Sequence, residues 1–374
     1  MRQEAKLKTK NQKPAPAMLP TLVSRLLEWF SENARDLPWR KTCDPYAIWI
    51  SEIMLQQTQV KTVIPYWERW MRELPTLQAL SAEQPDKILK LWEGLGYYTR
   101  ARNLQKAAQL VCENFGGKFP KNFHEIIALP GIGRYTAGAI SSIAFKQPSP
   151  ILDGNVIRVL TRIFGISGNP RDKIINEQLW RLASDLVSLA RKKTSPKSIS
   201  PDSNCSFLNQ SLMELGALIC TPRSPKCAEC PAKKMCVAYR DNRIEELPAL
   251  EKRSQPTKRR FVAFVVERKG RFLVQQRPVK VVNANLWEFP NMELLADDAF
   301  ASHEYFNVAT SAIPLCTIKH SITRYRITVD AFHASLNETK KVPAGKWLFV
   351  SELQKLAFSS AHRQILDRLS SAAK

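Results

Sequence analysis

The sequence lacks any apolar run near the roughly 20 residues that a helix needs to span a bilayer. Residues 1–17 are polar and basic, so the sequence also lacks the apolar segment that is typical of a secretory signal. Neither an internal repeat nor a coiled-coil heptad pattern is present. We therefore expect a cytoplasmic protein without a membrane span, in which residues 1–17 form a basic arm.

Acidic residues are scarce relative to basic ones. The chain has 34 Asp and Glu against 56 Lys and Arg, which gives a net charge of +22. An excess of this size exceeds what solubility requires, and it indicates a polyanionic partner. Charge alone leaves two candidates for that partner, a nucleic acid and an anionic membrane surface.

The hydrophobic pattern divides the 374 residues into two parts, in line with a usual domain size of about 100–200 residues. From Pro20 to about Arg240, apolar residues recur at three- and four-residue steps, which predicts helices. After Arg259, β-type runs dominate, and Lys269-Gly270 between two of them indicates a hairpin. We predict a mainly α domain over residues 18–240, a linker over 241–258 and an α+β domain over 259–374.

Proline and capping residues mark where the expected elements begin and end. The first long helical run extends from Pro45 to Glu68, with Asp44 as its N-cap. Residues 191–204 form an expected inserted loop, rich in Lys, Ser and Pro and without periodicity. The other expected elements are helices over 85–91, 101–114, 134–145, 156–164, 174–190 and 361–369, and strands over 261–268, 271–276 and 322–334.

Four of the eight cysteines lie close together, at Cys220, Cys227, Cys230 and Cys236. In a reducing compartment, clustered thiols indicate a metal site more often than disulfides. Thiolates select zinc or iron–sulfur clusters, and a zinc ribbon usually has two C-x2-C pairs where this sequence has one. The spacing therefore favours an iron–sulfur cluster and leaves zinc open.

Two carboxyl residues have unusual settings. Glu52 shares a predicted helix face with Trp49 and Leu55, and burial on such a face raises a carboxyl pKa and keeps a proton available. Asp153 precedes a predicted helix, whose N-terminus would favour the ionised form. Taken singly, these residues could be a surface glutamate and an ordinary cap. As a pair with separated pKa values, they are suited to cleaving a glycosidic bond.

A glycine-containing turn supplies a third feature. Leu129-Pro130-Gly131-Ile132-Gly133 precedes a predicted helix, and its backbone N–H groups would point outward at the helix N-terminus. Such a turn binds phosphate, although a plain corner between two helices has the same sequence pattern.

In this order, the motifs resemble the MutY family of adenine DNA glycosylases, within the helix-hairpin-helix superfamily. The matching motifs span the first domain and are Leu37-to-Arg40, Asp44-to-Tyr46, Ser51-to-Val60, Trp92-to-Asn103, Leu129-to-Ala137, Leu152-to-Asn155 and Asn209-to-Cys236. The resemblance implies a helix-hairpin-helix glycosylase domain, made of a six-helix barrel module and an iron–sulfur module. The four cysteines match the ligands of the family's [4Fe–4S] cluster, whose role is structural and in DNA docking.

The resemblance also implies roles in catalysis. Glu52 would protonate adenine N7, and Asp153 would stabilise the oxocarbenium-like sugar, with a transient covalent adduct as an alternative. Asn155 would orient the carboxylates. The target base must be flipped out of the duplex, because the reacting bond is inaccessible in stacked DNA. The implied adenine pocket consists of Trp39, Arg40, Leu55 and Gln210, the duplex wedge of Gln57 and Tyr97, and the phosphate grip of Gly131 and Gly133.

Tyr135 separates two branches of the superfamily. The related endonuclease III type has a lysine at this position, which attacks the sugar and cleaves the strand. Tyrosine has no amine, so we expect a monofunctional glycosylase with weak or no lyase activity. An endonuclease III-like pyrimidine glycosylase is the alternative enzyme, and a non-catalytic iron–sulfur DNA-binding protein is the alternative from another class.

The second domain resembles the Nudix-like C-terminal domain of the family, through Arg271-to-Pro278 and Leu286-to-Pro290. The glutamate-rich metal box of Nudix hydrolases is absent after Pro290, which argues against pyrophosphate hydrolysis. The family's hairpin that reads 8-oxoguanine corresponds to Ile322-Thr323-Arg324, where Thr323 keeps a hydroxyl and Arg324 replaces a histidine. We therefore expect a monomeric, nucleoid-associated enzyme that acts on double-stranded DNA at A·8-oxoG or A·G mispairs.

Overall fold

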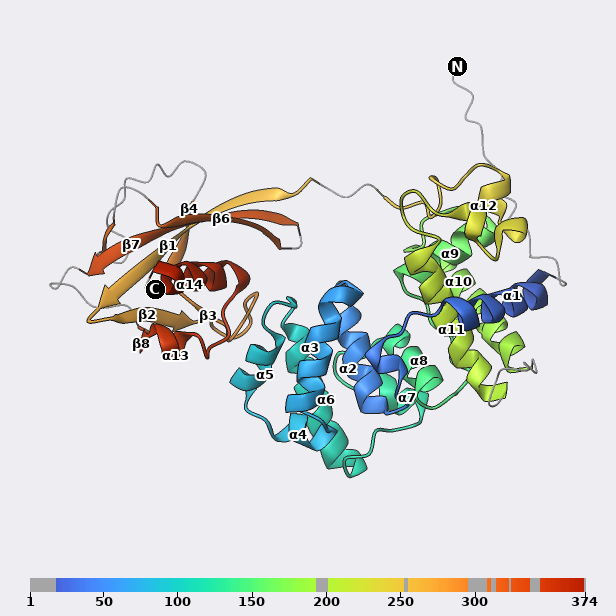
Figure 1. Cartoon of the computed structure of the whole chain (residues 1–374), viewed down its shortest axis with the longest axis horizontal. Coiled ribbons are helices and arrows are strands. Elements are labelled where there is room, and N and C mark those ends of the chain that lie inside the picture. Colours follow the sequence, from blue (N-terminus) through green and yellow to red (C-terminus); the bar gives the residue numbers. More distant parts are fainter. Residues whose placement is uncertain are drawn as a thin grey trace, which may run out of the picture. The chain divides into compact units, whose positions relative to one another are not determined.

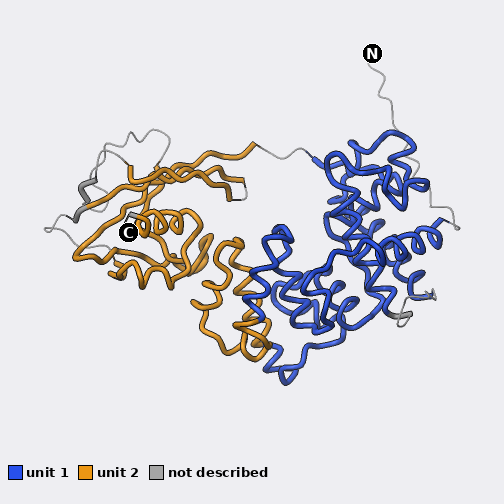
Figure 2. The backbone as a smooth tube through the Cα atoms, viewed as in Figure 1, with its two compact units in different colours: residues 1–71, 110–252 blue, residues 72–109, 253–374 orange. Residues whose placement is uncertain are grey.

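The computed structural model describes residues 18–192, 201–251, 255–294, 308–310, 314–322, 324–336 and 344–372. The expected basic arm over 1–17 lies outside them. The chain divides into two compact units, of which the first extends to residue 71 and resumes over 110–252 (Figure 2). The second unit consists of residues 72–109 and 253–374. In the described ranges, no helix combines the length and apolar character that crossing a membrane requires.

The first unit is helical, as the sequence predicts (Figure 1). Asp44 caps α2 by accepting hydrogen bonds from the backbone N–H groups of Tyr46 and Ala47, which confirms the predicted helix start. The elements that lie entirely in this unit are α1 (Met18–Asn33), η1 (Pro38–Arg40), α2 (Pro45–Leu55), α7 (Phe123–Ile127), α8 (Arg134–Ile143), α9 (Gly154–Phe164), α10 (Lys173–Arg191), α11 (Pro201–Leu218), η2 (Cys227–Glu229), η3 (Lys233–Met235) and α12 (Val237–Arg240).

Three sequence-based boundaries are wrong. The run from Pro45 to Glu68 is two helices, because Gln57 adopts a left-handed φ of 60° and the chain turns before α3 (Val60–Glu73). Residues 201–204 of the expected loop are the first turn of α11, while 193–200 lie outside the described residues. The expected strand over 322–334 contains a hairpin connection, because β6 ends at Ile322 and β7 begins at Tyr325.

The core of the first unit forms where α1, α9, α10 and α11 meet, with Leu22, Val159, Leu186 and Leu212 fully or almost fully buried. Two glycines allow close backbone approaches around this core. A Cβ at Gly138 in α8 would lie 2.3 Å from the Pro150 carbonyl oxygen, and one at Gly216 in α11 would lie 2.6 Å from the Asn155 Cβ. Since Asp153 and Asn155 follow Pro150 closely, these approaches help to fix both residues.

The second unit combines helices with a mixed sheet. Its helical elements are α4 (Leu77–Ala82), α5 (Pro85–Trp92), α13 (Val350–Leu353) and α14 (Ser360–Ala372), together with the first part of α6 (Thr99–Phe115). The strands are β1 (Thr257–Arg268), β2 (Arg271–Gln276), β3 (Trp287–Glu288), β4 (Asn291–Leu294), β5 (Val308–Thr310), β6 (Cys316–Ile322), β7 (Tyr325–Leu336) and β8 (Lys346–Phe349).

In the described residues, the strands form one sheet with the order β3-β2-β1-β7-β5. In addition, β4 pairs with β1, β6 with β7 and β8 with β2. β1 and β2 are antiparallel and join at Lys269-Gly270, which confirms the predicted hairpin. Alternate residues of β1 face opposite sides, so that Ala263 and Val265 pack under α14 while Val262 and Phe264 form a second apolar cluster. The α+β class expected for the second domain is thus confirmed.

The close approach at Gly138 makes a prediction about stability. Gly138→Ala should lower the free energy of unfolding by about 1–3 kcal/mol, because the new methyl group must displace a backbone carbonyl. Gly154→Ala is the matched control, since a Cβ there meets no atom within 4 Å. Urea unfolding followed by the helical signal measures both variants, and equal midpoints for the two would contradict the packing argument.

Candidate active site

A cavity of about 530 Å³ opens in the first unit, and it gathers most residues that the sequence assigns to catalysis and base binding. Its walls come from the segment around η1, from α2, from α8, from the start of α9 and from α11. The predicted residues in this lining are Trp39, Arg40, Glu52, Leu55, Gln57, Tyr135, Asp153, Asn155 and Gln210. Chain segments separated by more than a hundred residues therefore contribute to one site.

Glu52 is buried in the cavity wall, with only 5% of its surface exposed. The Tyr135 hydroxyl donates a hydrogen bond of 2.6 Å to Glu52 Oε2. Burial raises the pKa of Glu52 to about 7, the charge of Asp153 adds to the rise, and the Tyr135 hydrogen bond and Arg40 oppose it. The direction agrees with the sequence-based expectation, and the carboxyl can hold a proton near neutral pH.

Asp153 is the N-cap of α9, as predicted. Its Oδ1 accepts the Val156 N–H at 2.8 Å, and its Oδ2 accepts the Asn155 side-chain amide at 2.9 Å. Burial nevertheless raises the pKa of Asp153 above its ordinary value, and these hydrogen bonds offset the rise only in part. The net shift is opposite to the one that the cap and helix dipole predict, because the sequence did not reveal how deeply the side chain is buried.

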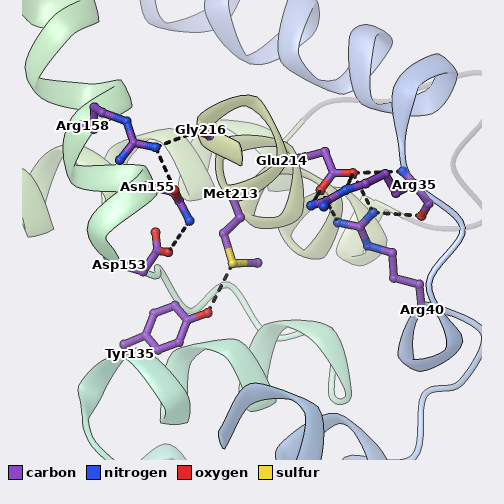
Figure 3. A network of polar contacts seen from close by, with 9 residues as sticks. All are labelled: Arg35, Arg40, Tyr135, Asp153, Asn155, Arg158, Met213, Glu214 and Gly216. Carbon is purple, nitrogen blue, oxygen red and sulfur yellow. Dashed lines mark hydrogen bonds and ion pairs between the residues drawn. The ribbon is translucent and has the colours of Figure 1, made fainter. Parts of the chain in front are cut away.

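Asn155 is held by a chain of polar contacts (Figure 3). Arg158 donates from Nη2 to Asn155 Oδ1 at 2.8 Å and to the Gly216 carbonyl at 2.7 Å, which joins α9 to α11. Its Nε donates to the Cys220 carbonyl at 2.6 Å. Because Asn155 in turn donates to Asp153, the orientation of the Asp153 carboxyl depends on contacts that reach the first cysteine of the run.

Tyr135 remains protonated in this setting. Burial raises its pKa well above the ordinary value of 10.0, and the carboxyls of Glu52 and Asp153 raise it further. Its hydroxyl also lies 3.3 Å from Met213 Sδ on α11 (Figure 3). From α8, Tyr135 can therefore donate a hydrogen bond to Glu52 on α2 or to Met213 on α11. Its phenol has no amine that could attack a sugar.

Glu214 is a buried acid that the sequence analysis missed. Its carboxylate accepts hydrogen bonds of 2.7–3.1 Å from the guanidinium groups of Arg35 and Arg40, and one from the Arg35 N–H (Figure 3). Burial alone raises the pKa of Glu214, but these hydrogen bonds outweigh it and lower the pKa to about 2. A single acid in the otherwise apolar stretch Leu212–Ile219 was the available signal.

The remaining base-binding candidates differ in how firmly they are held. Arg40 is tied to Glu214 and also donates to the Arg35 carbonyl at 3.0 Å, so its guanidinium is fixed at the cavity wall. Trp39 is buried, with its ring 6.1 Å from that of Trp67. The Gln210 side-chain amide donates to Ser206 Oγ at 3.1 Å.

The DNA-contact candidates include two strained residues and one tight turn. Gln57 and Tyr97 both have left-handed backbones, with φ of 60° and 46°, and Tyr97 exposes 48% of its surface. Gly131 has a φ of 79°, which favours glycine, and Gly133 is the extended N-cap of α8. The predicted turn before a helix N-terminus is therefore present.

The four clustered cysteines are free thiols that share the lining of one small cavity with Arg162 and Tyr239. Arg162 Nη1 lies 3.5 Å from Cys220 Sγ and donates to the Thr221 carbonyl at 2.8 Å. Burial raises the pKa of Cys230 to about 12. In the part of the chain that the structure describes, no three His, Cys, Asp or Glu side chains form a group suited to holding a metal ion.

The predicted lesion-reading hairpin lies at the tip of β6 and β7, where Ile322 pairs with Tyr325. Thr323 is outside the described residues. Arg324 is exposed, and its Nη2 donates to the Tyr325 hydroxyl at 2.9 Å.

Comparison with known proteins matches one family model to most of the helical part of the chain and another to the part that carries the sheet. Residues 50–185 match the model of the HhH-GPD superfamily base excision DNA repair proteins, and residues 261–368 match the NUDIX domain. This agrees with the predicted pairing of a helix-hairpin-helix domain with a Nudix-like one.

Similar proteins cover most of the chain. The adenine DNA glycosylase of Buchnera aphidicola subsp. Schizaphis graminum is 41% identical over 72% of this chain and 74% of its own length. The adenine DNA glycosylase of Rattus norvegicus is 34% identical over 91% of this chain and 76% of its own length. The structure of a thermostable thymine-DNA glycosylase matches with a TM-score of 0.53 and 32% identity, over 60% of this chain and 98% of the other. The chain therefore belongs to the adenine DNA glycosylase family.

Proposed function

We propose that this protein is a monofunctional adenine DNA glycosylase of base excision repair, which removes adenine paired with 8-oxoguanine or guanine. The observation that carries the proposal is the pair of buried carboxyls, Glu52 and Asp153, in one cavity with the Tyr135 hydroxyl. The volume of about 530 Å³ is within the usual range for a small-ligand site. The family relationship supplies adenine as the base.

Glu52 is the proposed general acid. A neutral carboxyl at the cavity wall donates its proton to N7 of the flipped adenine, which makes the base a better leaving group. Tyr135 holds the Glu52 carboxyl in place through the 2.6 Å hydrogen bond. Arg40 and Trp39 line the space beside it, and Glu214 fixes Arg40 there.

Asp153 is the proposed stabiliser of the sugar. As adenine leaves, positive charge develops on the sugar ring, and an ionised carboxylate in a buried site stabilises that charge strongly. Asn155 orients Asp153 by donating to Oδ2, and water then attacks the sugar. With tyrosine at position 135, the cavity offers no amine there for a lyase step, so the strand stays intact.

The proposed DNA contacts use backbone geometry and charge. The turn at Gly131 and Gly133 presents N–H groups to a phosphate, and the net charge of +22 favours a polyanion. Gln57 and Tyr97 are the proposed wedges in the duplex. The hairpin around Ile322-Thr323-Arg324 is the proposed reader of 8-oxoguanine, which depends on the family resemblance.

The proposed cofactor is a [4Fe–4S] cluster held by Cys220, Cys227, Cys230 and Cys236. The residues fit such a group by kind, since all four are free thiols, and they line one cavity without converging on a single ion. Arg162 lies beside Cys220 Sγ. A bound cluster would cross-link the loop after α11. That loop carries Arg223, Lys226, Lys233 and Lys234, which suits a contact with phosphates.

The proposed reaction makes a direct prediction about substrates. The protein should release adenine from A·8-oxoG duplexes and more weakly from A·G duplexes, and the abasic strand should break only after alkali treatment. Asp153→Asn and Glu52→Gln should each lower the single-turnover rate by at least about a hundredfold. Equal release from A·T, or release of oxidised pyrimidines, would contradict the specificity.

The raised pKa of Glu52 predicts the pH dependence. The single-turnover rate should fall as the pH rises above about 7, because the acid loses its proton there. In Glu52→Gln, the residual rate should no longer fall across this pH range. A flat rate profile of the parent protein across pH 7 would contradict the role of Glu52.

The raised pKa of Glu52 also predicts how the stability of the fold depends on pH. The carboxyl's contribution to the free energy of unfolding is present in acid and is lost as the pH rises through about 7. Glu52→Gln should therefore stabilise the fold above that pH.

The cofactor proposal predicts colour and metal content. Protein purified without air should be brown, absorb broadly in the visible range and contain iron, and Cys230→Ser should lower the iron content. Cys43→Ser is the control, because Cys43 is an exposed cysteine outside the run. Stoichiometric zinc in place of iron would contradict the cluster.

A further inference from the structure

The loop after α5 has a strained shape that presents Tyr97 to solvent. Gly94, Gly96 and Tyr97 all have positive φ, of 105°, 68° and 46°. Arg100 braces the loop from inside, since its Nη2 donates to the Leu95 carbonyl at 2.9 Å and to the Gly96 carbonyl at 3.2 Å. The loop is therefore held in one form, which makes its attachment to its surroundings important for where Tyr97 lies.

The segment Leu356–Phe358 belongs to the core of the C-terminal sheet in the same compact unit. The Trp287 N–H donates to the Ala357 carbonyl at 2.8 Å, and the Ser359 N–H donates to the Trp287 carbonyl at 3.3 Å. Phe358 is fully buried against Phe289, at a ring distance of 5.8 Å. This backbone is thus a rigid part of the sheet.

Glu93 joins the loop to that segment. Its Oε1 accepts the Phe358 N–H at 2.8 Å, and its Oε2 accepts Lys90 Nζ at 2.6 Å. Lys90 Nζ also donates to the Leu356 carbonyl at 2.9 Å, and Arg363 Nη1 lies 3.6 Å from Glu93 Oε2. The Glu93 carboxylate therefore contacts α5 through Lys90, the backbone of Phe358 in the core of the sheet, and α14 through Arg363.

The contacts around Glu93 are shielded from water, unlike an ordinary surface pair. The Glu93 side chain is 13% exposed, and burial lowers the pKa of Lys90. Such charge-assisted bonds are stronger than those at a solvated surface. A second contact supports the same docking, because Arg102 Nη1 on α6 donates to the Ala284 carbonyl at 3.0 Å.

We propose that Glu93 is a positioning residue that ties the Tyr97 loop to the core of the C-terminal sheet. Through this tie, the loop and the sheet that carries the β6–β7 hairpin present their DNA contacts as one rigid surface. Two contacts on one rigid body gain affinity together, whereas two contacts on independent parts do not. The part of this inference that concerns DNA rests on the proposed function. The contact between Glu93 and Phe358 does not depend on that function.

The tie is tested first in the full-length protein without DNA, by amide hydrogen exchange. Glu93→Ala should speed exchange at Phe358 and at residues 95–98 together, by roughly fivefold to tenfold, the worth of one net hydrogen bond. Glu93→Gln keeps an acceptor oxygen and should restore part of the protection. Glu83→Ala, which removes the more exposed pair with Lys87, is the matched control and should change neither segment.

The consequence for DNA is tested by binding, in an Asp153→Asn background that prevents turnover. Glu93→Ala should lower the preference for A·8-oxoG over A·G duplexes by roughly fivefold to tenfold, with Glu83→Ala unchanged. Unchanged exchange in either segment overturns the tie, and an unchanged preference overturns its role in recognition. A parent protein that prefers neither duplex contradicts the proposed function instead, and the exchange experiment still decides the tie.

Discussion

A carboxyl group kept out of water is the constraint on which the first unit depends. Glu52 can hold a proton near neutral pH only because α2 is buried on nearly every side, so that the helix must be enclosed by its neighbours. The same enclosure forms the cavity and brings Tyr135 and Asp153 to its wall. The close approaches at Gly138 and Gly216 follow from it, since the surrounding segments must lie near enough to exclude solvent.

Two buried acids in the same cavity have pKa values shifted in opposite directions. Glu52 receives one phenol hydrogen bond, and its pKa rises to about 7. Glu214 receives the guanidinium groups of Arg35 and Arg40, and its pKa falls to about 2. The difference lies in the number and charge of the donors, because both side chains are buried. One acid is thereby suited to giving up a proton and the other to anchoring cations without competing for that proton.

The sequence predicted the helical and α+β parts and the residues around the cavity, because spacing, caps and the family resemblance each depend on local pattern. It did not predict Glu214, whose partners are more than 170 residues away in the chain. It also missed the break at Gln57, because a left-handed residue leaves the apolar periodicity intact on both sides. The direction of the Asp153 shift was wrong for a related reason, since burial depth is a property of the assembled fold.

The division into two units has a consequence for how the chain folds as it is made. Residues 72–109 pack with residues 253–374, so α4 and α5 leave the ribosome long before their partners exist. At usual rates of synthesis the delay is on the order of ten seconds. During this interval, Lys90 and Glu93 lack the Leu356 carbonyl and the Phe358 N–H that they bind in the finished fold. The loop that carries Tyr97 should therefore reach its final position only after the sheet of the second unit has formed.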